Sequence, residues 1–210
     1  MKKRGAKKIK SNMDVAHLFE YIKRYRFFAL ILIPLYTFLF AIQDSLLLSN
    51  LSRIGNMPNN YGKFVVWGIV CSSFYNSFFA FLFSMLGYPH KGGWTLYRIA
   101  CLLLLLTVLL PFIPEKYPFF SFLHNQFAMI ATLVTLAATF LLTLHTKSID
   151  PKIYQKALLM WIVDVALCFV VLLRTGISGL TETLFIITTS VHLYCIMWWT
   201  YCSGKLENSL

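Results

Sequence analysis

The sequence has few charged residues. Asp, Glu, Lys and Arg make up 13% of its 210 residues, whereas hydrophobic residues make up 58%. A soluble globular domain averages roughly 25% charged and roughly 45–50% apolar residues, so this composition excludes a soluble enzyme domain, a disordered chain and a coiled coil. The apolar residues run in long stretches instead of alternating with polar ones, which disfavours a membrane β-barrel. The class that remains is an all-α polytopic membrane protein.

Acidic residues are the scarcest charged type, with 8 Asp and Glu against 19 Lys and Arg. In a soluble protein the resulting net charge of +11 would suggest a nucleic-acid partner. No nucleic-acid-binding motif accompanies the charge, and basic residues in cytoplasmic loops also orient membrane proteins. We therefore expect the lipid bilayer, and no nucleic acid, as the partner of this chain.

The chain also lacks the patterns of paired cysteines and of known catalytic sites. Its five cysteines lie within or beside apolar runs without a CxxC pair, which indicates small buried hydrophobes and predicts neither a disulfide nor a thiolate metal site. No HExxH, GxSxG or paired-aspartate motif is present. We therefore assign no catalytic residue, no metal and no cofactor, and an enzyme is the less favoured reading.

Six stretches are apolar and long enough to cross a membrane. A span needs about 20 mostly apolar residues, because the hydrocarbon core is about 30 Å thick and a helix rises 1.5 Å per residue. The sequence therefore predicts a six-transmembrane-helix bundle. The expected spans are Phe27–Leu48, Phe64–Gly87, Thr95–Ile113, Ser121–Leu144, Ala157–Leu173 and Leu180–Cys202.

The distribution of basic residues predicts the orientation of the spans. With the N-terminus inside, only four of the 19 Lys and Arg residues fall in outer segments. Cytoplasmic loops carry the excess of basic residues, so both termini are expected in the cytoplasm, in the cytoplasmic membrane of a bacterium. The four outer residues are Arg53, Lys63, Lys116 and Arg174.

Three regions follow from this topology: a basic cytoplasmic leader (1–26), the transmembrane domain (27–202) and a cytoplasmic tail (203–210). Within the leader, Val15–Arg26 has apolar residues at helical spacing with basic residues between them, which predicts a short amphipathic helix on the inner membrane surface. The alternative is a helical extension of the first span. The Ser49–Lys63 link is rich in turn residues and is expected to be a flexible outer loop.

Polar residues inside the spans are the first candidates for a functional site. A charged group at the bilayer centre costs roughly 2.5–3.5 kcal/mol on insertion scales, so such a residue needs a functional or structural explanation. The helix rise places Asn76, Asp164 and His192 within ~5 Å of one depth. We expect them to form a ligand-binding cluster, with apolar walls from Phe74, Phe78 and Trp161. The alternative is structural, because polar contacts between spans also hold helices together.

A second group of polar residues lies at the outer ends of the spans. It carries both signs of charge, and it is expected to form an outward-facing polar mouth unless its members are simply solvated at the interface. Its members are Asp44, His124, Arg174 and Glu182.

One stretch of the chain resembles a known group of proteins. An S-x-I-G-N turn is followed by a G-x-F-x-x-W-G helix entry, and the fourth span opens with HNQFA. With the six-span layout, this resembles a broad group of uncharacterised six-span bacterial membrane proteins, distantly similar to the DRAM/Sfk-type membrane family. The resemblance implies a six-helix bundle linked to lipid or membrane homeostasis, and no reaction. It is carried by Ser52, Ile54, Gly55, Asn56, Gly62, Phe64, Trp67, Gly68 and His124.

Three functions stay open from the sequence. The first is a polar intramembrane pocket that binds a small or lipid-like ligand for transport, sensing or lipid handling. The second is a non-catalytic accessory, immunity or assembly subunit with a membrane-protein partner. The third is an intramembrane hydrolase that uses His124, Asp44 and Glu182 as acid–base groups or metal ligands.

Overall fold

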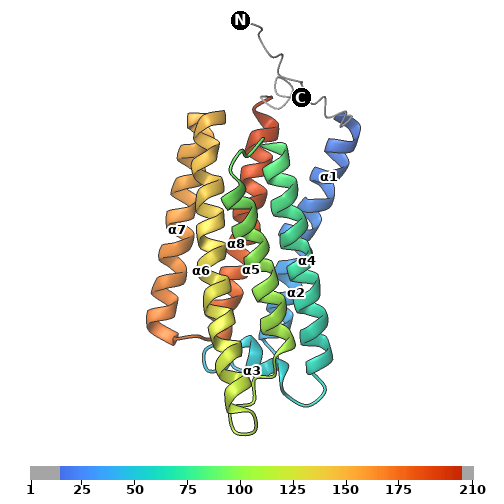
Figure 1. The fold of residues 1–210 in the computed structure, drawn as a ribbon, viewed down its shortest axis with the longest axis vertical. Helices are drawn as coiled ribbons and strands as arrows, with labels where there is room; N and C mark the ends of the chain where they lie inside the picture. Colours follow the sequence, from blue (N-terminus) through green and yellow to red (C-terminus); the bar gives the residue numbers. More distant parts are fainter. Residues whose placement is uncertain (1–14, 205–210) are drawn as a thin grey trace, which may run out of the picture.

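The computed structural model describes residues 15–204, and its regular elements there are all helical. Six helices are long and apolar enough to cross a membrane, which confirms the prediction of an all-α chain with six such helices (Figure 1). The first 14 residues of the predicted leader and residues 205–210 of the predicted tail lie outside the described part of the chain. The six helices are Leu18–Ala41, Tyr61–Met85, Lys91–Leu109, Pro118–Ile149, Pro151–Thr175 and Gly179–Cys202.

The first of these helices is built from three consecutive elements, and one short helix follows it. Helix α1 (Val15–Phe27), the π-helical segment η1 (Phe28–Leu32) and α2 (Ile33–Ala41) form one continuous rod, and α3 (Leu51–Gly55) comes next. The remaining helices are α4 (Tyr61–Met85), α5 (Lys91–Leu109), α6 (Pro118–Ile149), α7 (Pro151–Thr175) and α8 (Gly179–Cys202).

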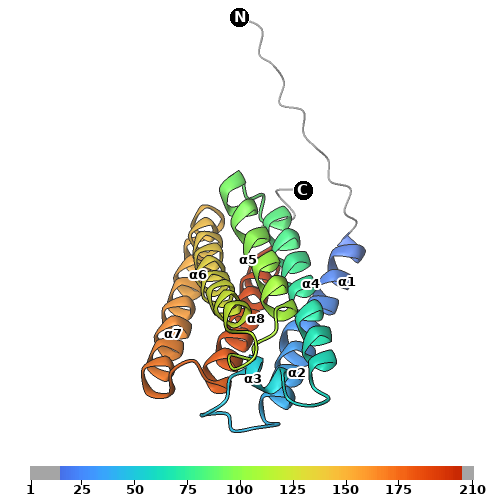
Figure 2. The ribbon, with the colours of Figure 1, turned by 60° about the horizontal axis from the view of Figure 1, so that its bottom comes forward.

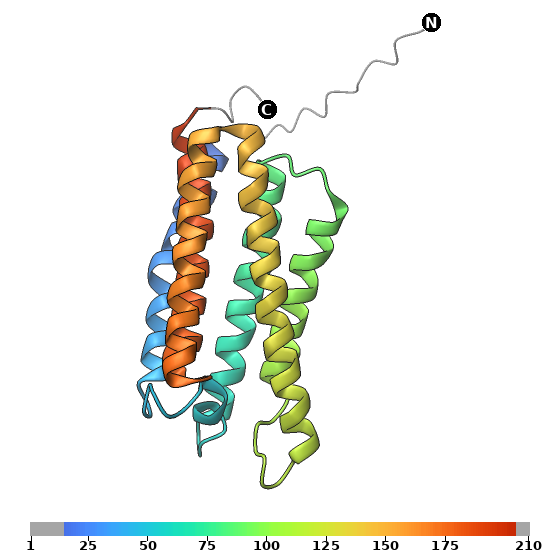
Figure 3. The same ribbon diagram turned by 90° about the vertical axis from the view of Figure 1, so that its left-hand side faces the viewer.

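The helices pack as a closed bundle. Helix α5 lies between α4 and α6, α7 lies against α6 and α8, and α8 packs against η1 and α2 to close the bundle (Figures 1 and 3). The start of α1 and the end of α8 lie at the same end of the bundle, as an even number of spans requires. Helix α3 lies at the other end, which we call the α3 end (Figure 2). Which end faces the cytoplasm stays a prediction.

A wide turn lets the first span pass a proline. Pro34 has no N–H to donate, so a regular α-helical hydrogen-bond ladder cannot continue through it. The five residues before Ile33 wind as a π-helix, in which the Ile33 N–H donates to the Phe28 carbonyl. Such single-turn insertions keep a helix continuous where the α-helical ladder is interrupted.

The N-terminal segment forms a helix, and that helix is continuous with the first span. Leu18 and Ile22 are buried in the core, and Tyr21 and Tyr25 stack on Phe81 and Phe78 of α4. This continuity is what the alternative reading, an extension of the first span, describes. The placement of the segment on an inner membrane surface stays a prediction.

The structure corrects the end of the first span. The helix ends at Ala41, seven residues before the expected Leu48, because the chain turns at residues 42–44 and the apolar run that follows is not helical. The next segment is also not the flexible loop expected for Ser49–Lys63. It contains α3, whose Leu51 and Ile54 are buried. Hydropathy recorded the apolar run but not the turn that separates it from the helix.

Aromatic rings and small residues fill the contact between the first span and α4. The rings of Phe40, Phe64 and Trp67 stack with centroids 5.6–6.3 Å apart. The Trp67 indole N–H donates to the Thr37 hydroxyl over 3.0 Å, so the polar atom of this buried ring is satisfied. Because lipid is as apolar as these side chains, close packing of this kind is what holds spans together.

Gly68 on α4 gives the first prediction. A Cβ at this position would come within 2.4 Å of the branched side chain of Val108 on α5, which has little freedom to move. We expect Gly68→Ala to destabilise the bundle by about 1–3 kcal/mol through overpacking. Thermal unfolding of the purified protein in detergent micelles measures this loss.

Gly62, in the first turn of the same helix, provides the control. Nothing lies within 4 Å of a Cβ built there, so Gly62→Ala should leave the unfolding temperature unchanged or raise it. Equal unfolding temperatures for the two variants would show that α4 and α5 are not in this close contact.

Candidate intramembrane polar site

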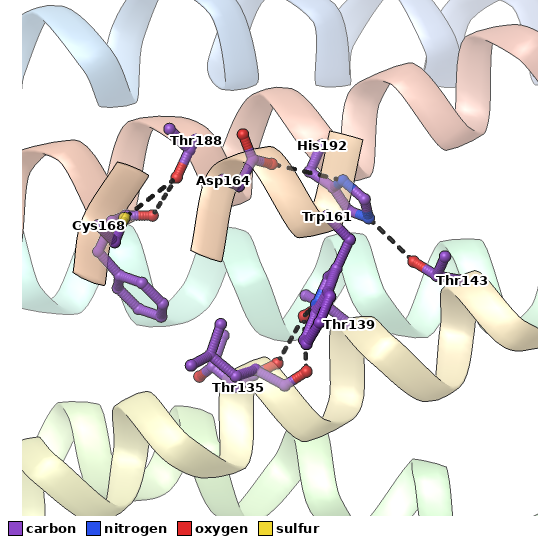
Figure 4. Close-up of polar contacts among 10 residues, drawn as sticks. Thr135, Thr139, Thr143, Trp161, Asp164, Cys168, Thr188 and His192 are labelled. Carbon is purple, nitrogen blue, oxygen red and sulfur yellow. Dashed lines mark hydrogen bonds and ion pairs between the residues drawn. The ribbon is translucent and has the colours of Figure 1, made fainter. Parts of the chain in front are cut away.

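Two of the three residues predicted to form a mid-membrane cluster lie next to each other. His192 of α8 and Asp164 of α7 are separated by 3.5 Å between Nδ1 and Oδ2 (Figure 4). The His192 side chain is 2% exposed and that of Asp164 is 19% exposed. Both residues lie on long apolar helices, where ionisable side chains are rare.

A third helix completes the surroundings of the pair. The other imidazole nitrogen of His192, Nε2, lies 3.0 Å from the hydroxyl of Thr143 on α6, which is fully buried. In the neutral tautomer with the proton on Nδ1, the imidazole points its N–H toward Asp164 and accepts a hydrogen bond from Thr143. His192 therefore connects α6 and α7 across the middle of α8.

The pair belongs to a wider polar seam between α6, α7 and α8, which consists of Thr139, Thr143, Trp161, Asp164, Thr188 and His192. Trp161 lies three residues before Asp164 on α7, and its indole N–H donates to the Thr139 hydroxyl over 3.2 Å. One turn after Asp164, the Cys168 sulfur lies 4.0 Å from the Thr188 hydroxyl. Figure 4 shows these side chains facing one another across the three helices.

The hydrogen bonding of the seam is incomplete at its centre. His192 Nδ1 is buried without a hydrogen-bond partner among the described residues, because 3.5 Å to Asp164 is too long for a good bond. Leaving a buried polar group unsatisfied costs about 1–3 kcal/mol. A group placed between Asp164 and His192, or a small shift of α7, would satisfy both.

Helix α7 contributes little to the core apart from this seam. Its buried residues are Ile153 and Ala157, both in its first two turns, and apolar residues on its outer face are exposed. Asp164 and Trp161 therefore anchor the middle of a peripheral helix.

Asn76 does not join the pair, and this corrects the sequence prediction. It lies on the exposed face of α4, whereas the neighbouring Tyr75 points inward. The Tyr75 hydroxyl donates to the Ile186 carbonyl over 2.7 Å and lies 2.8 Å from the Ser190 hydroxyl of α8. Helix rise predicts how deep Asn76 lies along α4, but not which side of the helix it occupies.

Of the three residues predicted to form apolar walls around the cluster, one lies beside the pair and two do not. Trp161 lies beside the pair, as expected. Phe74 and Phe78 instead stack on Phe28 and Tyr25, so they face the first span and not the pair. Thr143 was not among the predicted residues, although Thr135, Thr139 and Thr143 recur at four-residue spacing and mark one polar face of α6.

The residues predicted to form an outer polar mouth all lie toward the α3 end, but they do not meet as a cluster of opposite charges. Arg174 is exposed and makes no ion pair with another described residue. The Ser49 hydroxyl donates to Asp44 over 2.6 Å. This bond and one from the Ser45 backbone hold the pKa of Asp44 below its usual value.

The other two members hold α3 in place. A Glu182 carboxylate oxygen accepts the Leu51 N–H over 2.6 Å, at the start of α3. His124 is 1% exposed, and its two ring nitrogens lie 2.6 Å from the Ser52 hydroxyl and 3.0 Å from the Leu110 carbonyl. The structure therefore gives these groups contacts with α3 and the loop beside it, not with one another.

No group of three His, Cys, Asp or Glu side chains within residues 15–204 is arranged to hold a metal ion. Comparison of the chain with family models, curated proteins and solved structures finds no match. The DRAM/Sfk-type resemblance therefore stays a prediction.

The inward position of Tyr75 can be tested against its neighbour. Tyr75→Phe removes the hydroxyl that joins α4 to α8 and should lower stability by about 0.5–1.5 kcal/mol. Asn76→Ala removes a side chain on the exposed face of α4 and should not lower stability. Unfolding in detergent followed by circular dichroism distinguishes the two. A loss of stability in Asn76→Ala but not in Tyr75→Phe would show that Asn76, and not Tyr75, faces the interior.

Proposed function

We propose that the protein is a multi-pass membrane protein that binds a small or lipid-like ligand at Asp164 and His192. The observation that carries this proposal is the incomplete hydrogen bonding at the pair, where a buried imidazole nitrogen lacks a partner and the facing carboxylate is partly exposed. A ligand that offers a hydrogen-bond acceptor to His192 Nδ1–H and a donor to the Asp164 carboxylate would satisfy both groups. The bound ligand would serve transport, sensing or lipid handling.

The energetics favour this reading over a purely structural one. A charged residue at the centre of a span costs roughly 2.5–3.5 kcal/mol on insertion scales. A polar contact between spans returns about 0.6 kcal/mol on average. Helix packing alone therefore does not offset the presence of Asp164, whereas a ligand that forms charge-assisted hydrogen bonds contributes about 1.5–3 kcal/mol for each bond.

The position of α7 supports a lateral route to the site. Of the six long apolar helices, α7 is the least buried, and exposed apolar side chains such as Ile162, Val163 and Leu167 lie beside Asp164. An apolar part of the ligand would rest against this face of α7 while its polar part reaches Asp164. A lipid-like ligand with a donor group fits both surfaces.

The matching test is native mass spectrometry of the protein purified in mild detergent, with lipids of the expression host as the probe. The wild-type protein should retain a bound molecule after delipidation. Asp164→Asn should reduce its occupancy about tenfold or more, since that variant loses a charge-assisted hydrogen bond. Glu115→Gln removes one carboxylate from an exposed loop and should retain the molecule.

Two results would contradict the proposal. One is equal retention of the molecule by the wild-type protein and Asp164→Asn. The other is failure of Asp164→Asn to accumulate in the membrane while Glu115→Gln accumulates normally, which would make Asp164 a structural residue.

A further inference from the structure

A serine and a histidine meet at the α3 end, far from the Asp164–His192 pair along the chain. The Ser52 hydroxyl of α3 lies 2.6 Å from His124 Nε2 of α6, although the two residues are 72 positions apart. Ser52 is 6% exposed and His124 is 1% exposed. A hydroxyl and an imidazole at this distance are the two groups that a nucleophilic serine site requires.

The orientation of His124 suits the role of a general base. Its Nδ1 lies 3.0 Å from the Leu110 carbonyl, which only accepts hydrogen bonds, so Nδ1 carries the proton in the neutral ring. Nε2 is then unprotonated and directs its lone pair at the Ser52 hydroxyl. In triad enzymes a carboxylate orients the imidazole in this way, and here a backbone carbonyl takes that place.

The surroundings fix the nucleophile and indicate its substrate. Glu182 accepts the N–H of Leu51, the residue before Ser52, and so positions the start of α3. The Phe112 ring lies 5.3 Å from the His124 ring, and exposed Leu47 and Leu48 precede α3 in the chain. A site with apolar neighbours at the end of a membrane bundle fits an ester with an apolar acyl chain.

We propose that Ser52 and His124 are the nucleophile and general base of a second site, which hydrolyses acyl esters at the α3 end. Ser52 Oγ bonds to the acyl carbon as its proton moves to His124 Nε2. The bond from the acyl carbon to the alkoxy oxygen then breaks, and the alcohol leaves with that proton.

Water completes the reaction. It adds to the acyl carbon and gives a proton to Nε2, the acyl–Ser52 bond breaks, and the acid leaves as Ser52 recovers its proton. The Ser52 backbone N–H has no acceptor among the described residues and is free to donate to the oxyanion.

A fluorophosphonate probe tests this site without knowledge of the natural ester, because it phosphonylates activated serines. Incubation of the purified wild-type protein with the probe, followed by peptide mass spectrometry, should show phosphonylation at Ser52. His124→Asn should slow this labelling at least about 100-fold, as expected for loss of a general base. Ser52→Ala should remove it.

Ser49 provides a matched control three residues away. Its hydroxyl bonds to the Asp44 carboxylate instead of an imidazole, so Ser49→Ala should label at Ser52 like the wild-type protein. An unlabelled Ser52 in the folded wild-type protein would overturn the proposal. Equal labelling of Ser49 and Ser52, or an unchanged rate in folded His124→Asn, would also overturn it.

Discussion

Hydrocarbon offers no hydrogen bonds, so each polar atom within these helices needs a partner in the chain itself. Several buried hydroxyls meet this demand locally by donating to a carbonyl one turn back, as Thr107 and Thr200 do. Others join helices, as Ser72 joins α4 to the Cys101 carbonyl of α5. His192 Nδ1 and the Thr183 hydroxyl are the two buried side-chain polar atoms without a partner among the described residues, and the first of them lies in the α6–α7–α8 seam.

The same need for hydrogen-bond partners explains the contacts at the α3 end, where the N–H groups at the starts of helices donate to acceptors in neighbouring segments. The first N–H groups of α8, from Gly179 and Leu180, donate to the carbonyls of Ser49 and Leu46, which lie in the segment just before α3. In return, Glu182 of α8 accepts the first N–H of α3. Gly179 permits this approach, because a Cβ there would come within 2.9 Å of the Ser49 carbonyl oxygen. The loop is ordered by these exchanges, which leave no signature in hydropathy.

Height along the bundle could be predicted from the sequence, but rotation about each helix could not. The number of spans, the position of α8 and the shared level of Asp164 and His192 follow from apolar run lengths and helix rise. Asn76 shows the limit: exposed positions of α4 such as Val66 and Ile69 are as apolar as its buried ones, so no apolar stripe in the sequence indicates which polar residue faces inward. Long-range partners such as Ser52 and His124 depend on how α3 folds back, which local pattern does not encode.

The π-turn in the first span has a consequence for the rotational phase of its two halves. Buried residues Ala29, Ile33, Thr37 and Ala41 follow one another at strict four-residue intervals. In a regular α-helix each such interval advances the side chain by about 40° around the axis, so the buried line would spiral away from its neighbours. A wider turn takes up part of this excess at Phe28–Leu32. One inserted residue thus keeps a single face of a long rod aligned with α4 and α8 from Leu18 to Ala41.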